Sequence, residues 1–483
     1  MIDRTAIVFV ASLLAAAAPV VRAAPATEQQ AVHVLNRLAF GPRPGDVERV
    51  RAMGVERWID AQLHPDRIAL PADLQARLDA LETVNRSAGA SLDEFLDLRK
   101  QARATDDDDA LQQRRQRQAQ VAREAAQARL LRAIDSPRQL EEVMVEFWFN
   151  HFNVYSGKGV VRALVSSYER DAIRPYALGS FRELLGATAK HPAMLFYLDN
   201  AVSSAAKPGG LNENYARELM ELHTLGVDGG YSQRDVTELA RMLTGWTFDQ
   251  RRLARAGETF RFDAKRHDGG AKTWLGQDIG PAGEREGEHA LDVLAVHPAI
   301  AHHISFELAQ YFVADAPPPA LVARMAASWT ASGGDIRTVL KTLFSSAEFM
   351  APAAAGAKFK TPYQFVVSAV RASGLPVTNT APLAGTMSQL GMPLYGCQTP
   401  DGYKNTQDAW LNPDALTRRI AFASALAGGK LALDAAPGTA LDAGALQATL
   451  ATTVSARTQD IVRRNPDKLQ AAMLLGSPDF MQH

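Results

Sequence analysis

The segment from residue 211 to residue 248, LNENYARELMELHTLGVDGGYSQRDVTELARMLTGWTF, constrains the fold most, because it has the pattern of two capped helices joined by a glycine turn. Asn212 is suited to cap a first helix over about residues 213 to 225. Ser232, with Asp235 three residues later, has the capping-box pattern that begins a second helix. A helical hairpin must bury its apolar faces against further helices, so the segment predicts a helix-rich fold.

The first helix of this hairpin carries a polar stripe. At 100° per residue one face collects Asn214, Arg217, Glu218 and Glu221. His223 falls roughly opposite this face and needs partners from another element. A solvated stripe, held by ion pairs at i,i+4 worth roughly 0.2–0.5 kcal/mol each, is one interpretation. The other is the wall of a pocket, in which Glu218 and Glu221 are catalytic and Asn214 and Arg217 bind a ligand.

Residues 138 to 153, RQLEEVMVEFWFNHFN, form the most apolar of the predicted helices. Such a helix is buried on several sides, so its few polar side chains face either water or another polar stripe. Asn150 is a candidate ligand-binding residue in the second case. The candidates for binding a divalent metal are Glu146, His151 and His223. Each of these is more often a satisfied structural group than a ligand, and both interpretations stay open here.

Helical periodicity dominates the rest of the chain, except over residues 255 to 280. There aromatic and β-branched residues flank a turn at Asp268, which predicts a short β-hairpin. His267 and Asp268 lie at this turn as an adjacent, exposed pair suited to proton transfer or metal binding, and an ordinary turn aspartate is the alternative. The expected fold class is therefore all-α, a multi-helix orthogonal or bundle-like array with one small β-hairpin insertion, in a single large domain over residues 25 to 483.

Residues 1 to 24 have the features of a signal peptide. They combine Arg4, an apolar run and the small residues Ala23 and Ala24, without a twin arginine. We expect export by the general secretory route and a periplasmic or secreted protein, with no integral membrane span after processing. A retained membrane anchor is the alternative.

The formal net charge of −1 gives no general attraction to nucleic acid, and a single cysteine, Cys397, excludes an intramolecular disulfide.

Two further segments stand out. Residues 101 to 135 are rich in arginine and glutamine and lack apolar heptads, which predicts a charged, solvated helical arm. Residues 391 to 413 form an irregular, aromatic and glycine-rich loop, of a length that usually indicates function or a lid. Tyr403 in this loop is a candidate ligand-binding residue. Cys397 is interpreted first as a small apolar filler.

Several motifs in order carry a resemblance: LNRLAFGPRPGDVERV, EFWFNHF, AKHPAMLFYLDN, the helical hairpin of residues 211 to 248, RHDGGAKTWLG and PLYGCQTPDGY. From about Glu28 to the C-terminus the chain resembles the exported bacterial family catalogued as domain of unknown function 1800. The resemblance implies an exported, mostly helical protein, often encoded beside a second exported family with a sulfatase-like fold. A sulfatase-like protein is therefore the expected partner. The family supplies no established reaction.

Two classes of function remain. The first is a hydrolase of an envelope or extracellular polymer, acting by acid–base or metal-assisted chemistry, with a divalent metal as the candidate cofactor. The second is a non-enzymatic periplasmic scaffold or partner-binding helical protein. Nucleophilic serine, phosphate-loop and dinucleotide motifs are absent from the sequence.

Overall fold

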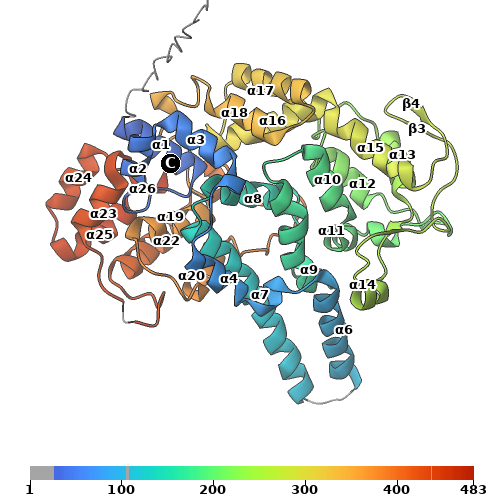
Figure 1. Cartoon of the computed structure of the whole chain (residues 1–483), viewed down its shortest axis with the longest axis horizontal. Helices are drawn as coiled ribbons and strands as arrows, with labels where there is room; N and C mark the ends of the chain where they lie inside the picture. The colour runs from blue at the N-terminus through green and yellow to red at the C-terminus, as the bar shows by residue number, and fades with distance from the viewer. Residues whose placement is uncertain (1–26, 105–107, 437) are drawn as a thin grey trace, which may run out of the picture.

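The structure is a computed structural model that describes residues 27–104, 108–436 and 438–483 (Figure 1). The described part is mostly helical with two small antiparallel sheets, which confirms the all-α expectation with a small hairpin. The predicted signal peptide, residues 1 to 24, lies outside the described residues. No helix in the described ranges is long and apolar enough to cross a membrane.

The helices fall into three groups along the chain. The N-terminal group comprises α1 (Glu28–Leu38), α2 (Asp46–Met53), α3 (Val55–Leu63), α4 (Ala72–Asp79), α5 (Glu82–Asn85), α6 (Ala88–Ala104), α7 (Asp108–Asp135) and α8 (Gln139–His151). The central group comprises α9 (Val161–Ser167), α10 (Phe181–Lys190), α11 (Pro192–Tyr197), α12 (Asn214–Glu221), α13 (Gln233–Leu243), α14 (Gln250–Ala256), α15 (Glu284–Val296), α16 (Pro298–Phe312), α17 (Pro319–Ser332) and α18 (Ile336–Phe344). The C-terminal group comprises α19 (Pro362–Ser373), α20 (Ala381–Gln389), α21 (Gln407–Trp410), α22 (Pro413–Ala427), α23 (Ala443–Leu450), α24 (Ala456–Arg463), α25 (Asp467–Leu475) and α26 (Pro478–Met481).

Helix α8 lies near the middle of the molecule, between the C-terminal group and the helices α10 to α12 (Figure 1). Its aromatic side chains are buried, and Trp148 donates its indole N–H to the Ala177 carbonyl at 3.0 Å. The continuous hydrophobic core of the described residues extends from Ala31 to Met481 and includes α8 throughout. A helix that is apolar over most of its circumference requires such surroundings, as the sequence predicts.

The helical hairpin of residues 211 to 248 consists of α12 packed against α13. The capping box of α13 is present, since Ser232 and Asp235 each accept the other's backbone N–H. Helix α12 is shorter than the predicted span of residues 213 to 225. The His223 N–H donates to the Glu218 carbonyl five residues back, at 3.0 Å, so the helix closes in a wide turn after Glu221.

Strand pairing is more extensive than the single predicted hairpin. Strand β1 (Trp246–Thr247) pairs with β2 (Arg261–Phe262), and β3 (Lys272–Trp274) pairs with β4 (Gln277–Ile279). The hairpin turn is at Leu275 and Gly276, both with positive φ, rather than at Asp268. A two-residue loop with positive φ at both residues matches the twist of the strands that it joins. The loop at Leu275 and Gly276 therefore sets which residues of β3 and β4 pair.

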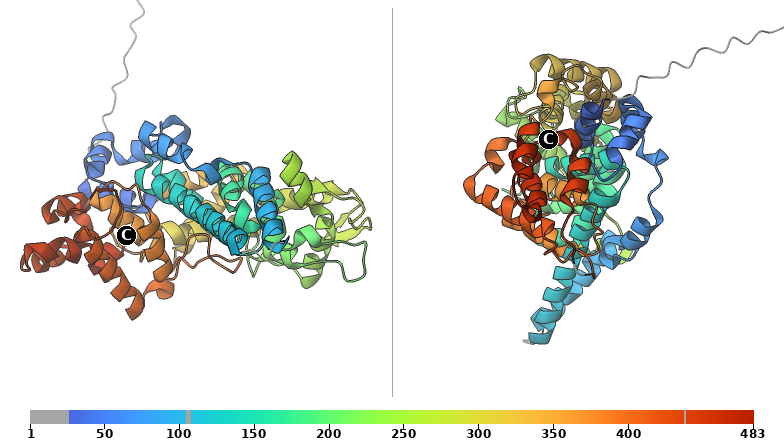
Figure 2. Two further views of the ribbon diagram at one scale, coloured as in Figure 1. Left: turned by 90° about the horizontal axis from the view of Figure 1, so that it is seen from below. Right: turned by 90° about the vertical axis from the view of Figure 1, so that its left-hand side faces the viewer.

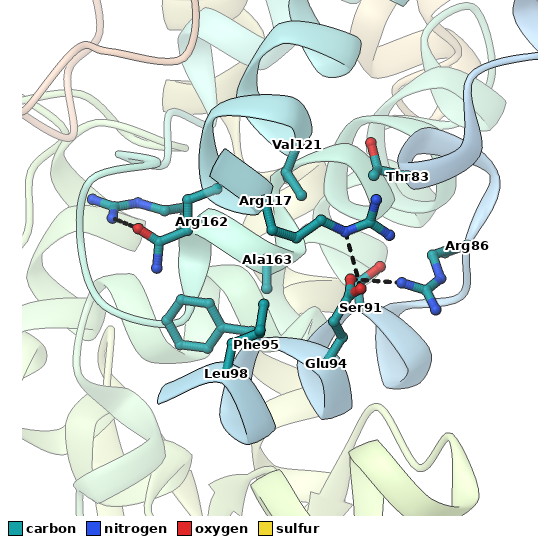
Figure 3. Close-up of a pocket in the computed structure, with 11 residues that line it drawn as sticks. Thr83, Arg86, Ser91, Glu94, Phe95, Leu98, Arg117, Val121, Arg162 and Ala163 are labelled. Carbon is teal, nitrogen blue, oxygen red and sulfur yellow. Dashed lines mark hydrogen bonds and ion pairs between the residues drawn. The ribbon is translucent and has the colours of Figure 1, made fainter. Parts of the chain in front are cut away.

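The predicted charged arm is half of a helical hairpin. Helices α6 and α7 lie side by side and project from the body of the molecule (Figures 1 and 2); residues 105 to 107, between them, lie outside the described residues. Near the base of the arm, Glu94 forms ion pairs with Arg117 at 2.9 Å and with Arg86 at 2.6 Å (Figure 3). The C-terminal half of α7 is buried in the body, so the solvated part of the arm is shorter than residues 101 to 135.

Candidate functional site

A polar pocket of about 250 Å³ opens where four segments meet: α8, the end of α12, α16, and the irregular loop between α20 and α21. Its hydrogen-bonding side chains include Glu146, Asn150, His151, Glu221, His303, Glu307, Gln310, Tyr311, Asp401, Tyr403, Lys404 and Asn405. Five of these are residues that the sequence proposes: Glu146, Asn150, His151, Glu221 and Tyr403. Segments separated by more than 200 residues in the chain thus contribute to one concave polar surface.

Two asparagines, Asn150 in α8 and Asn153 just after it, fix the irregular loop over the pocket. The Asn150 side chain donates to the Tyr403 carbonyl and accepts the Tyr403 N–H, both at 2.8 Å. Asn153 donates to the carbonyl oxygens of Cys397 at 3.1 Å and Thr399 at 2.8 Å. Gly402 permits this approach, because a Cβ there would lie 2.3 Å from the Asn150 carbonyl oxygen. Asn150 therefore positions the loop as well as lining the pocket.

His151 forms a close pair with a glutamate of α16. Its Nδ1 lies 2.8 Å from a Glu307 carboxylate oxygen, and its Nε2 lies 3.1 Å from the His223 carbonyl oxygen. Both neighbours are acceptors, so an imidazolium with two N–H groups satisfies both contacts. Burial acts to raise the pKa of Glu307, but the charge and hydrogen bond of His151 outweigh it, and the pKa is lowered. His151 and Glu307 thus form an ion pair that joins α8 to α16.

His303 lies on the same face of α16, one turn before Glu307. Its Nε2 is buried without a hydrogen-bond partner among the described residues, 3.6 Å from a Glu307 oxygen. Burial lowers the pKa of His303, with the Glu307 charge acting in the opposite direction. A neutral imidazole with a free nitrogen at a pocket wall is suited to accept a proton. The sequence signal for this pair is the i,i+4 spacing of a histidine and a glutamate on one helix.

Carboxyl groups from α12 and the loop also lie at or near the pocket. The pKa of Glu218 is raised, mainly because the group is half-buried and further because Glu221 and Asp401 carry like charge. Asp401 accepts from Lys404 at 2.9 Å. Glu221 lines the pocket, and Glu218 lies behind it on the same helix face. This grouping favours retention of a proton on Glu218.

Glu146 is buried at the inner end of the pocket. Burial raises its pKa, while Arg129 and the hydrogen bond from Tyr311 act to lower it. The Tyr311 hydroxyl donates to Glu146 at 2.8 Å and accepts from Gln364 at 3.3 Å. Glu146 is therefore held by a hydrogen-bonded chain that passes inward, away from the loop.

Two residues of the α12 stripe, Asn214 and Arg217, make their contacts outside the pocket. Arg217 bonds Glu213 at 3.1 Å and Gln233 at 2.9 Å, and both its partners lie outside the pocket. Asn214 contacts the Leu198 carbonyl at 3.4 Å. Of the four residues of the stripe, Glu221 lines the pocket, whereas Asn214, Arg217 and Glu218 do not.

His267 and Asp268 are not the exposed turn pair that the sequence predicts. The His267 side chain is buried, with Nε2 3.2 Å from Glu286 and Nδ1 2.9 Å from the Thr244 carbonyl. Asp268 accepts two hydrogen bonds from Arg241, at 2.8 and 3.1 Å. These contacts lower the pKa of Asp268 to about 2, the hydrogen bond from Arg241 contributing most. The pair connects the sheet region to α13 and lies outside the pocket.

The three proposed metal ligands lie near one another without converging. His223 is 1% exposed, its Nε2 has no hydrogen-bond partner among the described residues, and its ring centroid lies 6.0 Å from that of His151. Glu146 is engaged with Tyr311, and His151 with Glu307. In the described ranges no three histidine, cysteine, aspartate or glutamate side chains are grouped as ligands of one ion. The divalent-metal hypothesis stays a prediction.

Comparison with known proteins identifies the family. No curated protein and no solved structure matches the chain. One family description, that of a protein of unknown function (DUF1800), matches residues 33–482. The match extends over nearly the whole sequence of 483 residues and confirms the family to which the motifs point. The chain therefore belongs to the DUF1800 family of proteins of unknown function.

Proposed function

We propose that the protein is an exported acid–base hydrolase whose active site is the pocket between α8, α12, α16 and the irregular loop. The observation that carries the proposal is a pocket wall with the His303 imidazole, whose buried Nε2 has no hydrogen-bond partner among the described residues, together with the carboxyl group of Glu218, which has a raised pKa and lies three residues before the wall residue Glu221. Groups whose pKa values are shifted in the directions that acid and base catalysis require are concentrated at active sites.

In this proposal His303 accepts the proton of an attacking water, and Glu218 donates a proton to the leaving group. Burial raises the pKa of Glu218, and the like charges of Glu221 and Asp401 raise it further, which suits this group to donate a proton. Glu307 and His151 position His303, because Glu307 contacts both imidazoles. General acid–base catalysis of this kind typically contributes a factor of about 10²–10⁴ to the rate.

The substrate class follows from the composition of the pocket wall and the leader sequence. The wall has more carboxylates than cationic side chains, so it favours neutral, hydroxyl-rich or cationic groups over phosphate and other anions. The signal-peptide pattern of residues 1 to 24 supports an exported bacterial protein, periplasmic or secreted. An envelope or extracellular polymer is the substrate that satisfies both conditions.

The experiment compares the purified wild type with His303→Gln and Glu218→Gln. The probes are 4-nitrophenyl glycosides, acetate and phosphate, together with an envelope polysaccharide fraction assayed for new reducing ends. We expect hydrolysis of a neutral probe and a loss of about 100-fold or more in kcat in either variant. Glu213→Gln is the matched control, because Glu213 bonds Arg217 outside the pocket. No hydrolysis of any probe, or full activity in both variants, would reject the assignment.

A second candidate function is supported by the projecting arm. Helices α6 and α7 extend from the body with exposed polar side chains, among them Lys100, Arg103 and Arg115. A non-enzymatic partner-binding or scaffold function would use this surface, and a sulfatase-like exported protein is the partner that the family resemblance implies. The triple variant Lys100→Ala, Arg103→Ala, Arg115→Ala should then weaken co-purification with that partner. Equal co-purification of the wild type and the triple variant with the partner would remove the support for this alternative.

A further inference from the structure

Cationic side chains are buried together on the side of the core away from the arm, where α1 meets the start of α19, α22 and the last residues of the chain. Arg37 is 2% exposed, Lys360 3% and Arg419 0%. His483 is buried beside them. Charged side chains are buried at this depth only when a partner compensates them.

The hydrogen bonds within the cluster leave several donors without an acceptor. One terminal nitrogen of Arg37 donates to the carbonyl oxygens of Ala354 at 2.6 Å and Val313 at 3.2 Å. Its Nε and its other terminal nitrogen are buried without a partner among the described residues. Unpaired buried donors are rare, and more than one on a single guanidinium indicates a missing acceptor.

Arg419 is compensated in a different way. Its guanidinium lies between the rings of Phe359 and Phe365, 4.6 and 4.8 Å from their centroids, and one nitrogen donates to the Lys360 carbonyl at 2.7 Å. Lys360 has its ammonium 3.8 Å from the centroid of the Phe480 ring. Aromatic faces stabilise a cation but do not neutralise it. The positive charge of the cluster therefore remains.

The carboxylate of Asp315 is already shared. Asp315 is the acidic residue that acts on Arg37, yet it also binds the Lys358 ammonium and accepts the Gln407 N–H at 2.8 Å. Burial accordingly lowers the pKa of Arg37 to about 9 and, with the charge of Arg419, that of Lys360 to about 7. One carboxylate cannot compensate Lys358, Arg37 and Lys360 together.

A small cavity lies at this place. It is lined by Asn36, Arg37, Lys360, Gln364, Ser368 and His483, among others. Its volume is about 10 Å³, roughly the space that one water-sized particle requires. The Gln364 amide and the Ser368 hydroxyl are engaged with Tyr311 and with the Phe365 carbonyl. The unpaired donors of the wall are thus those of the Arg37 guanidinium.

We infer that this cavity is a binding site for a monovalent, monatomic inorganic anion of the chloride class, held by Arg37 and Lys360. The size excludes phosphate and sulfate, which need room for four oxygens. A single negative charge supplies an acceptor to the unpaired donors and compensates the excess cation. Because Arg37 belongs to α1 and Lys360 precedes α19, the anion connects the two ends of the fold.

The test is the thermal unfolding of the full chain in sodium chloride and in sodium gluconate at equal ionic strength. A bound chloride should raise the wild-type Tm by several degrees with saturation, whereas the larger gluconate should not. Lys360→Met removes one buried charge while keeping the side-chain length, and it should abolish the chloride-dependent rise. Arg418→Met is the matched control, because this neighbour of Arg419 in sequence bonds Asp414 at the surface, and it should retain the rise.

Crystals grown with sodium bromide provide an independent measurement that does not rely on a stability change. An anomalous peak within hydrogen-bonding distance of the Arg37 guanidinium is the expected result in the wild type, and its loss in Lys360→Met is the expected result in the variant. Equal Tm values in chloride and gluconate, a chloride response retained in Lys360→Met, or a cavity that holds only water would each overturn the inference.

Discussion

The Nδ1 of His151 lies 2.8 Å from a carboxylate oxygen of Glu307, and this contact joins α8 to α16 at the wall of the pocket. Glu307 also lies 3.6 Å from His303, so one carboxylate contacts two imidazoles. The same two helices are joined deeper in the core by the bond from Tyr311 to Glu146. Two polar contacts therefore join α8 to α16 at the pocket, beside the edge-to-face contact of the Phe147 and Tyr311 rings.

The first prediction concerns Glu307→Gln. Removing the carboxylate leaves the buried His151 without its charged partner, and we expect a loss of about 1–3 kcal/mol in the free energy of unfolding at pH 7. Urea denaturation of wild type and variant measures it. Glu213→Gln, which alters an exposed pair, should change stability by less than about 1 kcal/mol. Equal midpoints for wild type and Glu307→Gln would show that the contact has no structural role.

The second prediction concerns pH. The pKa of Glu307 is lower in the folded than in the unfolded chain, so the unfolded state binds more protons and stability rises with pH through this group. The stabilisation is present above the ordinary glutamate pKa and is lost as pH falls through the pKa of Glu307 in the folded chain. The difference in stability between wild type and Glu307→Gln should therefore shrink below about pH 4. A constant difference from pH 7 to pH 3 would contradict the ion pair.

Glu146 gives a third prediction of opposite sign. Its pKa is raised by burial, so the folded state retains a proton that the unfolded state loses, and the charged form is destabilising above the folded pKa. Glu146→Gln keeps an acceptor for the Tyr311 hydroxyl and removes that charge. We expect the variant to be as stable as the wild type or more stable at pH 7, with the gain declining toward pH 4. Loss of stability at pH 7 would mean that the attraction to Arg129 dominates.

How far the sequence predicts the site depends on whether the pattern is local. The 100° spacing separates Glu221, which lines the pocket, from His223, which is buried and does not line it. The His303 and Glu307 pair was missed, because an i,i+4 pair on one helix also describes an ordinary solvated face. Only the packing of α8 against α16 gives that pair a partner in His151, and a single sequence does not contain this contact.

The fold was predicted where capping and periodicity are strong and missed where long-range pairing decides. The capping box at Ser232 and the apolar helix around Trp148 are both local signals, and both are confirmed. The pairing of Trp246 with Phe262 was missed, because strands of two or three residues have almost no periodicity. Asp268 was assigned to an exposed turn since its partner, Arg241, lies 27 residues earlier.

The divalent-metal hypothesis leads to a fourth prediction. If Glu146, His151 and His223 bind a metal, micromolar Zn²⁺ or Mn²⁺ should raise the wild-type Tm with saturation, because a ligand that binds only the folded state stabilises it. If Glu218 also binds the metal ion, Glu218→Gln should reduce the metal-dependent rise in Tm. Thermal unfolding of both proteins with and without metal, and after treatment with a chelator, is the measurement. Identical unfolding curves under all conditions would reject the divalent-metal hypothesis and leave acid–base catalysis without a metal ion as the proposal.

The last prediction separates the sheet region from the pocket. Two hydrogen bonds from Arg241 hold Asp268, and the pKa of Asp268 is lowered to about 2, so its contribution to stability is present above the ordinary aspartate pKa and lost as pH falls toward 2. Asp268→Asn should therefore lower the Tm at pH 7 and narrow its difference from the wild type at pH 2.5. Because the Asp268 contacts lie outside the pocket, kcat on any probe that the wild type hydrolyses should be unchanged at a temperature well below the Tm. A loss of kcat in Asp268→Asn with an unchanged Tm would instead place this residue in the catalytic machinery, as its position beside His267 in the sequence first indicated.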